Sequence, residues 1–208
     1  RVEINGKRKY ETPGGTPVAS VTTILGETKD KTHLIEWRKR VGEEVANKIS
    51  TQAATRGTAV HTLAEDYINN KEDWSKGAMP ANIFSFNQIK TILDERLDNV
   101  WAQEVPLYSD KFKIAGRVDC IAEFDGQLTI IDFKTSRKPK KKEWIENYFT
   151  QAAFYAAAFF ERTGVSIKQF AIVIAVDDNE PQVFTGKTHD YLNKLLDARI
   201  KYAEDKGI

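Results

Sequence analysis

The residues most able to do chemistry in this chain are two aspartates and a lysine. Asp119 closes the stretch 116–119, whereas Asp132 and Lys134 lie within the stretch 131–136. Carboxylate oxygens are the ligands that Mg²⁺ prefers, and they also suit Mn²⁺. A metal-bound water is the nucleophile that a phosphodiester needs, and an ammonium group can position that water or stabilise charge on the phosphate. These residue types therefore indicate metal-dependent hydrolysis of a phosphodiester.

The segment between the two aspartates predicts a tight β-hairpin. Two strand-like runs flank the dipeptide Asp-Gly at 125–126, which is a strong two-residue turn signal. Counting outward from this turn sets Asp119 directly opposite Asp132. Opposed side chains have Cβ atoms roughly 4.5 to 5.5 Å apart, and two like charges so placed are destabilising unless something compensates them. A divalent cation would compensate the pair.

The same register predicts which side chains share each face of the hairpin. Side chains alternate along a strand, so Lys134 is expected on the face of Asp132 and opposite Arg117. This charged face is expected beneath a cleft, and the alternative is an ordinary solvated face without function. The opposed register and the apolar approach to Asp132 favour function. The other face is expected to pack on the core through Val118, Cys120, Ala122, Phe124, Ile131 and Phe133.

Flanking elements must hold this hairpin in place. The hydrophobic spacing is compatible with helices over 34–49, 59–68, 83–100, 144–162 and 191–202. Strand signals cover 102–108, 113–124, 128–135, 170–176 and 183–184. The opening of the chain is predicted to be an irregular arm, in which a turn at the prolines and glycines of 13–17 joins short extended pieces. This order of elements predicts an α/β layer fold.

Length and composition limit the class of protein. At 208 residues with 41% hydrophobic content, the chain can bury one substantial core and needs no second domain. We expect a single domain over 1–208, in which the mainly helical residues 1–100 form one wall of a cleft and residues 101–208 form the catalytic sheet core. Basic and acidic residues number 31 and 30, so a nucleic-acid partner must be met by local patches.

Cysteine and apolar content exclude several classes of site. Cys120 is the only cysteine, which excludes a disulfide framework within the chain, a cysteine-rich zinc site and a four-cysteine iron–sulfur cluster. No apolar run approaches the roughly 20 residues that cross a bilayer. We therefore expect a soluble, intracellular protein with no membrane partner and no iron–sulfur cofactor.

Several motifs of the chain resemble those of one nuclease family. GRVD at 116–119, IDFKTS at 131–136 and QAAFY at 151–155 resemble the G-x-x-D, (D/E)-x-K-T and Q-x-x-x-Y motifs of RecB-like PD-(D/E)XK nucleases. RGTAVHTLAE at 56–65 resembles the histidine-bearing helix of that group. SVTTIL at 20–25 resembles the N-terminal segment of the mitochondrial genome maintenance exonucleases and related phage exonucleases. The order and spacing of these motifs make the combination specific.

The resemblance implies a restriction-endonuclease-like core, with a mixed β-sheet flanked by helices. It implies a divalent metal, Mg²⁺ or Mn²⁺, at Asp119 and Asp132, with the peptide carbonyl of Phe133 as a further ligand. It also implies metal ligation or close support by His61 and a catalytic role for Lys134. Relatives with an iron–sulfur cluster need four cysteines, so the single cysteine favours the cluster-free exonucleases. A phage origin, and hence the cytoplasm of a bacterial host, is suggested by resemblance alone.

Four further residues are candidates for the same site. His61 shares a helical face with the glutamate four residues later, so it is either a metal ligand or part of a surface helix. Gln151 and Tyr155 share a face of a helix rich in small residues, where they contact a phosphate or orient the lysine, unless Tyr155 is simply core. Glu104 either extends the acidic cluster through a metal-bound water or is a plain surface glutamate.

A basic run follows the second motif and is expected to hold a DNA backbone. RKPKKK at 137–142 supplies five cations immediately beyond the two hydroxyl residues that end the motif. Such runs are usually solvated loops, but one this close to a catalytic lysine lies where the phosphate chain must pass. The residues expected to contact nucleic acid are Thr135, Ser136, Arg137, Lys138, Lys140, Arg56, Arg117, Ser20, Thr22 and Thr23.

Together these features predict Mg²⁺- or Mn²⁺-dependent hydrolysis of DNA by an exonuclease that acts on single strands or ends in replication, recombination or repair. An endonuclease with the same chemistry is an alternative, because the catalytic residues do not determine whether the site admits only ends. A nucleic-acid-binding module without catalysis is a second alternative, since fold and function are separable. A structural partner protein that binds neither metal nor DNA is a third.

Overall fold

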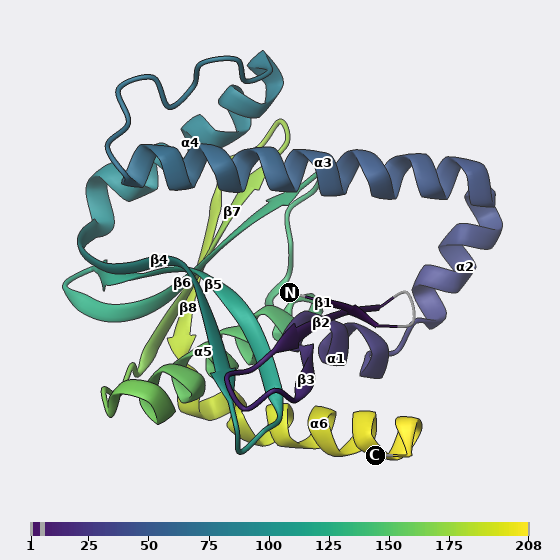
Figure 1. Cartoon of the computed structure of the whole chain (residues 1–208). Helices are drawn as coiled ribbons and strands as arrows, with labels where there is room; N and C mark the ends of the chain where they lie inside the picture. Colours follow the sequence, from purple (N-terminus) through teal and green to yellow (C-terminus); the bar gives the residue numbers. More distant parts are fainter. Residues whose placement is uncertain (1, 5–6, 208) are drawn as a thin grey trace.

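The computed structural model describes residues 2–4 and 7–207 of the chain. Three short strands come first, and helices and longer strands follow (Figure 1). The strands are β1 Val2–Ile4, β2 Lys7–Glu11, β3 Pro17–Ser20, β4 Leu97–Ser109, β5 Ile114–Phe124, β6 Gln127–Ser136, β7 Gln169–Val176 and β8 Gln182–Lys187. The α-helices are α1 Val21–Thr28, α2 Thr32–Val41, α3 Glu43–Ile68, α4 Pro80–Arg96, α5 Glu146–Thr163 and α6 Leu192–Lys206. Short 3₁₀ turns lie at Lys142–Trp144 and Thr188–Tyr191.

The eight strands of the described residues belong to one mixed sheet. Along its main path the order is β1-β2-β3-β5-β6-β7-β8, and β4 pairs with the remaining edge of β5. β3 with β5 and β6 with β7 are parallel, whereas the other pairs are antiparallel. The helix α5 connects β6 to β7, because a parallel pair needs a crossover that returns the chain to the same end of the sheet. The expected mixed sheet is therefore confirmed.

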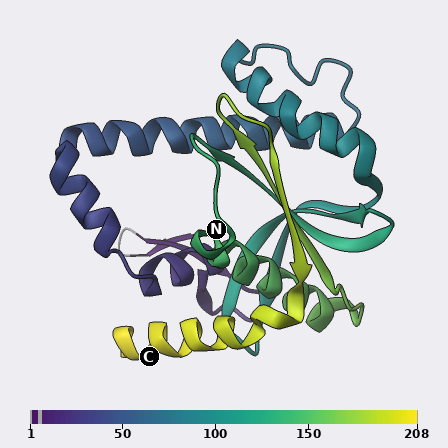
Figure 2. The same cartoon turned by 180° about the vertical axis from the view of Figure 1, so that it is seen from behind.

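Helices cover both faces of this sheet. On one face α3 and α4 bury Val60 and Ile89 against Phe133, and we call this cluster the α3-side core. On the other face α1, α5 and α6 bury residues such as Phe154 against Ile121, which we call the α5-side core. Figures 1 and 2 show α3 and α6 on opposite sides of the sheet. Burial on both faces explains why β7 is almost continuously apolar.

The central strand β5 changes partners along one of its edges. β4 pairs along the first edge over 114–124. On the second edge β3 pairs with the first two residues of β5, and β6 pairs from Cys120 onward. Residues 116–119 therefore have no strand partner on the second edge, while β6 continues beside β7. We call this opening, bounded by residues 116–119 and 132–134, the fork.

The predicted hairpin register is confirmed up to the fork. Phe124 pairs with Gln127 around the Asp-Gly turn, and Cys120 pairs with Ile131. Both turn residues have positive φ, 54° and 74°, as a two-residue hairpin turn of this kind requires. Asp119 and Asp132 occupy the next positions, where backbone pairing between the two strands has ended.

One expectation about the faces of the hairpin was wrong. Val118 packs in the α5-side core together with Ile121, not with Cys120 on the α3 side. The alternation is interrupted because β6 no longer pairs with β5 there, and the facing residue Glu104 has a left-handed φ of 52°. The face that carries the charged residues also bears Ile121 and Ile130, which are buried in the α5-side core.

The N-terminal region also differs from expectation. Residues 7–20 form β2 and β3, which extend the sheet, and the Ser20 hydroxyl caps α1 by accepting the backbone N–H of Thr23. Pairing with β5 organises these strands, and local pattern gave no signal of that contact. The helix expected over 34–49 is divided at Gly42, which has a φ of 86°, and α3 then runs unbroken to Ile68. None of the described helices combines the length and the apolar content needed to span a bilayer.

Candidate active site

Asp119 lies at the fork and contacts two other elements. Its Oδ2 accepts the backbone N–H of Phe133 at 2.9 Å. His61 of α3 places Nδ1 3.5 Å from the same oxygen, and Nε2–H of the ring donates to the Phe133 carbonyl oxygen at 2.6 Å. Asp119 and His61 therefore form hydrogen bonds with the backbone N–H and carbonyl of Phe133, at the point where β6 no longer pairs with β5.

Asp132 lies on the α5 side of the same opening and is 1% exposed. Its Oδ1 accepts a hydrogen bond from Gln151 Nε2 at 3.1 Å, and its Oδ2 forms an ion pair with Lys134 Nζ. Beyond that ion pair, Oδ2 has no hydrogen-bond partner among the described residues. A carboxylate oxygen has more than one acceptor site, so Oδ2 could also ligate a metal ion beside this ion pair.

Asp119 and two further residues, His61 and Glu104, form a group of three possible metal ligands. His61 from α3, Glu104 from β4 and Asp119 from β5 place one ligand atom each within 4.8 Å of one another. The β4–β5 register explains the approach of Glu104, because residues 103 and 105 pair with the neighbours of Asp119. The structure thus places Glu104 in the acidic cluster and turns His61 toward the sheet.

Burial makes the charges of this site costly. Burial, and then the charge of Asp132, raise the pKa of Asp119 above its ordinary value. Burial and the charge of Asp119 raise the pKa of Glu104 in the same way. Burial opposes the Lys134 ammonium, but Asp132 and Asp119 outweigh it, so the pKa of Lys134 is raised as well. Three carboxylates face two cations, Lys134 and Arg117, which leaves negative charge that a divalent cation would neutralise.

Gln151 and Tyr155 of α5 close the fork on the side away from α3. Gln151 Nε2 donates to the Tyr155 oxygen at 3.3 Å as well as to Asp132. The Tyr155 ring fills the space in front of Gly116, where an added Cβ would lie 2.7 Å from Tyr155 Cε1. The motifs at 116–119 and 151–155 are therefore joined by a close contact that depends on the missing side chain of Gly116.

Tyr148 belongs to the site, although our sequence analysis did not single it out. Its ring centroid lies 5.1 Å from Lys134 Nζ, so the ammonium is held between an aromatic face and the Asp132 carboxylate. A cation–π contact of this kind is worth about 0.5 to 2 kcal/mol. The signal that could have found Tyr148 is its position three residues before Gln151, on the same face of α5.

Two arginines expected to contact nucleic acid form ion pairs within the protein. Arg117 Nε donates to the Glu104 carbonyl oxygen at 2.7 Å and lies 3.0 Å from Glu104 Oε2. The prediction that Arg117 lies opposite Lys134 was wrong, because β6 no longer pairs with β5 at that position. Arg56 pairs with Asp177 just beyond β7. Contact of either arginine with DNA stays a prediction.

The hydroxyl residues and the basic run lie around the fork. Ser20 Oγ lies 3.0 Å and 2.8 Å from the hydroxyls of Thr22 and Thr23, at the start of α1 and beside the first residues of β5. Gly57 of α3 faces Thr135, since an added Cβ would lie 3.9 Å from the Thr135 hydroxyl. The mostly exposed segment 137–142 joins β6 to α5.

Comparison with known proteins identifies the family. Residues 34–203 match the profile of the PD-(D/E)XK nuclease superfamily, and this span includes every charged residue of the fork described above. The chain belongs to the PD-(D/E)XK nuclease superfamily. The family predicted from the motifs is therefore confirmed.

Relatives of this PD-(D/E)XK chain carry nuclease names. Mitochondrial genome maintenance exonuclease 1 from Mus musculus is 27% identical over 174 residues, which cover 79% of this chain and 51% of that protein. The protein of the same name from Homo sapiens is 27% identical over 178 residues, with the same coverage of both chains, 79% and 51%. A crystal structure of a provisionally named exonuclease from Eubacterium rectale has a TM-score of 0.47 and 18% identity, over 69% of this chain and 63% of that chain. The chain spans about half the length of the mitochondrial exonucleases.

The donor atoms at the fork fit the divalent metal that PD-(D/E)XK nucleases use. Oxygen donors predominate, which suits Mg²⁺ and Mn²⁺ better than a thiol-preferring ion. The convergent groups are the imidazole of His61 and the carboxylates of Glu104 and Asp119, and Asp132 and the Phe133 carbonyl adjoin them. Cys120 is buried in the α3-side core, and burial raises the pKa of its thiol to about 12, so it is unsuited to metal binding.

Asp119→Asn is expected to stabilise the protein in the presence of a chelator. Folding raises the pKa of Asp119 above 3.8, so the folded state loses stability relative to the unfolded state as the pH rises and Asp119 ionises. The variant should be about 1 kcal/mol more stable at pH 7, and the difference should shrink as the pH falls towards 4. Urea denaturation across this range measures it, and a variant less stable at every pH would contradict the argument.

The same variant tests the metal site. Mn²⁺ should raise the melting temperature of the wild type, because an ion that binds the folded state stabilises it. It should raise that of Asp119→Asn much less. Equal shifts in both proteins would remove Asp119 from the ligand set.

Gly116→Ala is expected to cost about 1 to 3 kcal/mol of stability, because the new methyl group would press on the buried Tyr155 ring. Tyr155→Leu removes the two nearest atoms, Cε1 and the hydroxyl oxygen, and leaves only Val21 Cγ1 at 3.2 Å. The double variant should therefore lose less stability than the sum of the two single variants. Denaturant titration of the four proteins gives this coupling, and additive losses would show that the contact does not constrain position 116.

Proposed function

We propose that this chain is a divalent-metal-dependent deoxyribonuclease that acts as an exonuclease on single strands or DNA ends. The convergence of Asp119, Asp132 and Lys134 at the fork carries the proposal. An ordinary solvated hairpin would leave its acids in water, yet these two carboxylates are 8% and 1% exposed. The relative named as an exonuclease, which aligns with 79% of this chain, supports action on ends.

The groups at the fork would hold a Mg²⁺ or Mn²⁺ ion. Such an ion lowers the pKa of a bound water and stabilises charge on a phosphate oxygen. Phe133 N–H orients the Asp119 carboxylate, and Gln151 orients that of Asp132. These contacts fix two acids from diverging strands in one place, so that little reorganisation accompanies the reaction.

Lys134 is positioned to act on charge at the phosphate. Its ammonium contacts Asp132 and the ring of Tyr148, and the neighbouring carboxylates raise its pKa. A lysine held in the protonated form cannot accept a proton. It therefore orients the attacking water or stabilises negative charge that develops on the phosphate.

The DNA strand is proposed to pass between the basic segment 137–142 on one side and α2 with the first half of α3 on the other. Within residues 32–59, Ala46 is the only buried residue, and α2 and the first half of α3 extend beyond the sheet (Figure 1). Arg137 connects the two sides through a hydrogen bond of 3.4 Å to Gln52 of α3. Because these helices contribute so little to the core, their exposed side chains are available to contact a DNA strand that enters the fork.

Cleavage should require both the metal and the fork. End-labelled single-stranded DNA incubated with the full chain and Mg²⁺ or Mn²⁺ should be degraded, and EDTA should stop the reaction. Asp132→Ala and Lys134→Ala should each slow it at least about 10²-fold. Gel electrophoresis of the products measures the rate.

Matched controls separate a local effect from unfolding or contamination. Asp197→Ala and Lys187→Ala remove an exposed aspartate and an exposed lysine outside the fork and should leave the rate unchanged. Circular dichroism should show that all four variants fold. Cleavage unaffected by both fork variants would refute the assignment.

The form of the DNA distinguishes the alternative functions. An exonuclease should degrade linear single strands and leave closed circular single strands intact. Cutting of the circle would favour the endonuclease, and binding of DNA without cleavage of either form would favour a non-catalytic module.

Tyr148 should affect the reaction through Lys134. Tyr148→Leu removes the aromatic face and should lower kcat about tenfold, whereas Tyr148→Phe keeps the ring and should stay near the wild type. The Mn²⁺ concentration that gives half-maximal rate should not move. A loss in the phenylalanine variant would transfer the role to the hydroxyl, and an unchanged leucine variant would exclude any role.

A further inference from the structure

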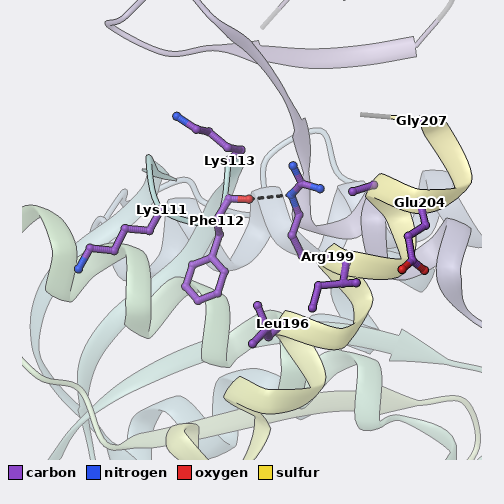
Figure 3. A pocket seen from close by; sticks show the side chains of 9 residues that line it. Lys111, Phe112, Lys113, Leu196, Arg199, Glu204 and Gly207 are labelled. Carbon is purple, nitrogen blue, oxygen red and sulfur yellow. Dashed lines mark hydrogen bonds between the residues drawn. The ribbon is translucent and has the colours of Figure 1, made fainter.

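A hollow surface lies between α5 and α6, on the side of the sheet away from α3. One hollow of about 940 Å³ is lined by Ala157, Phe160 and Leu192, among others. A second of about 470 Å³ follows α6. Both include Phe112 of the β4–β5 turn, so they adjoin, and we call the pair the Phe112 groove. Figure 3 shows the second hollow, in which Phe112 lies beside Leu196 of α6.

The floor of the Phe112 groove is apolar and accessible. Phe160, Leu196 and Ile200 are 55%, 47% and 48% exposed, although they are large hydrophobic residues. Single exposed apolar residues are common on proteins, but a contiguous patch lining a hollow marks an interaction site. The volumes are in the range of recognition pockets.

The groove is rigidly built. Arg199 Nε donates to the Phe112 carbonyl oxygen at 2.8 Å, which fastens the β4–β5 turn to α6 (Figure 3). Ser109 Oγ accepts the Phe112 N–H at 3.0 Å and donates to Glu161 of α5 at 2.6 Å. The turn is thus tied to both helices, so a ligand would meet a preformed surface and pay little ordering entropy.

The rim of the groove carries unneutralised positive charge. Its lining residues Lys111, Lys113, Lys168 and Arg199 form no ion pair with a described residue. The lining acid Glu161 is paired with Arg162, which leaves Glu204 at the far end. Because the whole chain has a net charge of +1, this local excess is a feature of the groove and not of the protein.

We propose that the Phe112 groove docks an acidic, amphipathic segment of a partner protein. Apolar side chains of the segment would occupy the two hollows, and its carboxylates would face the four rim cations. A nucleic-acid backbone would suit the cations but would leave the apolar floor uncovered. A second copy of the chain would set the same four cations against one another, so the charge pattern opposes self-association through this face.

The position of the groove separates docking from the fork. The groove follows α5 and α6, and its lining includes none of the residues that form the fork. A partner bound there would leave the fork accessible. The proposal does not depend on nuclease activity, and its test measures binding alone.

A displayed library of random peptides, selected on the full chain, should yield sequences that combine Asp or Glu with large apolar residues. The most enriched peptide, made with a fluorescein label, should bind the wild type with an anisotropy change that weakens as salt is raised. The double variant Lys111→Glu/Lys113→Glu should bind it at least about tenfold more weakly. Leu196→Ser should also weaken binding.

The matched control reverses two exposed lysines elsewhere. Lys39→Glu/Lys48→Glu changes the net charge by the same amount on α2 and α3 and should bind the peptide like the wild type. Selection that yields no binder, yields peptides without acids, or yields binding insensitive to Lys111→Glu/Lys113→Glu would overturn the proposal. Two further outcomes would overturn it. One is that the groove variants weaken the binding of a labelled single-stranded oligonucleotide and leave peptide binding unchanged. The other is that the wild type forms a dimer in analytical ultracentrifugation and the groove variants dissociate it.

Discussion

The candidate active site depends on the point where hydrogen bonding between β5 and β6 stops. Up to Cys120 and Ile131 the strands pair in register, and beyond them β6 follows β7 while β5 stays with β4. The backbone groups released at this point need new partners, since a buried N–H or carbonyl is seldom left unpaired. Asp119 accepts the N–H of Phe133, and His61 donates to its carbonyl. The end of the ladder therefore creates, inside a packed core, a place where acids from two strands and a histidine from a helix meet.

Grouping these acids in a buried position lowers the stability of the folded state. Burial and mutual repulsion raise the pKa of Asp119, and the Lys134 ammonium offsets only part of the negative charge. The surrounding packing must hold the acids together despite this cost, and α5 supplies much of it. Its alanines at 152 and 153 are fully buried, so the helix lies close to the sheet, and Tyr155 fills the space that Gly116 leaves. A strained centre held by a well-packed scaffold is the arrangement expected of a functional site.

Two regions of the protein suit different partners. The fork combines buried acids with the basic segment 137–142 and with the projecting residues 32–59, among which only Ala46 is buried, and this fits a charged, extended substrate. The α5–α6 side combines apolar hollows with unpaired cations, which fits an acidic peptide. The chain is nearly neutral overall, so both properties arise from where the charges lie and not from how many there are.

The sequence by itself determined the parts of this protein that depend on neighbours along the chain. The Asp-Gly turn sets the register of its own hairpin, because two adjacent residues with positive φ leave the strands one way to pair. That register, with the ordered motifs, was enough to predict the family and to bring Asp119 and Asp132 to the fork. Contacts between distant segments were decided only by the tertiary structure. The strands within residues 7–20 form because β3 pairs with β5. Arg117 forms an ion pair with Glu104 because β6 no longer lies beside β5 at that position. Tyr148 contacts Lys134 because α5 crosses the sheet there. Local pattern carries no information on such contacts, since their energy comes from the packing of elements that the chain brings together only when it folds.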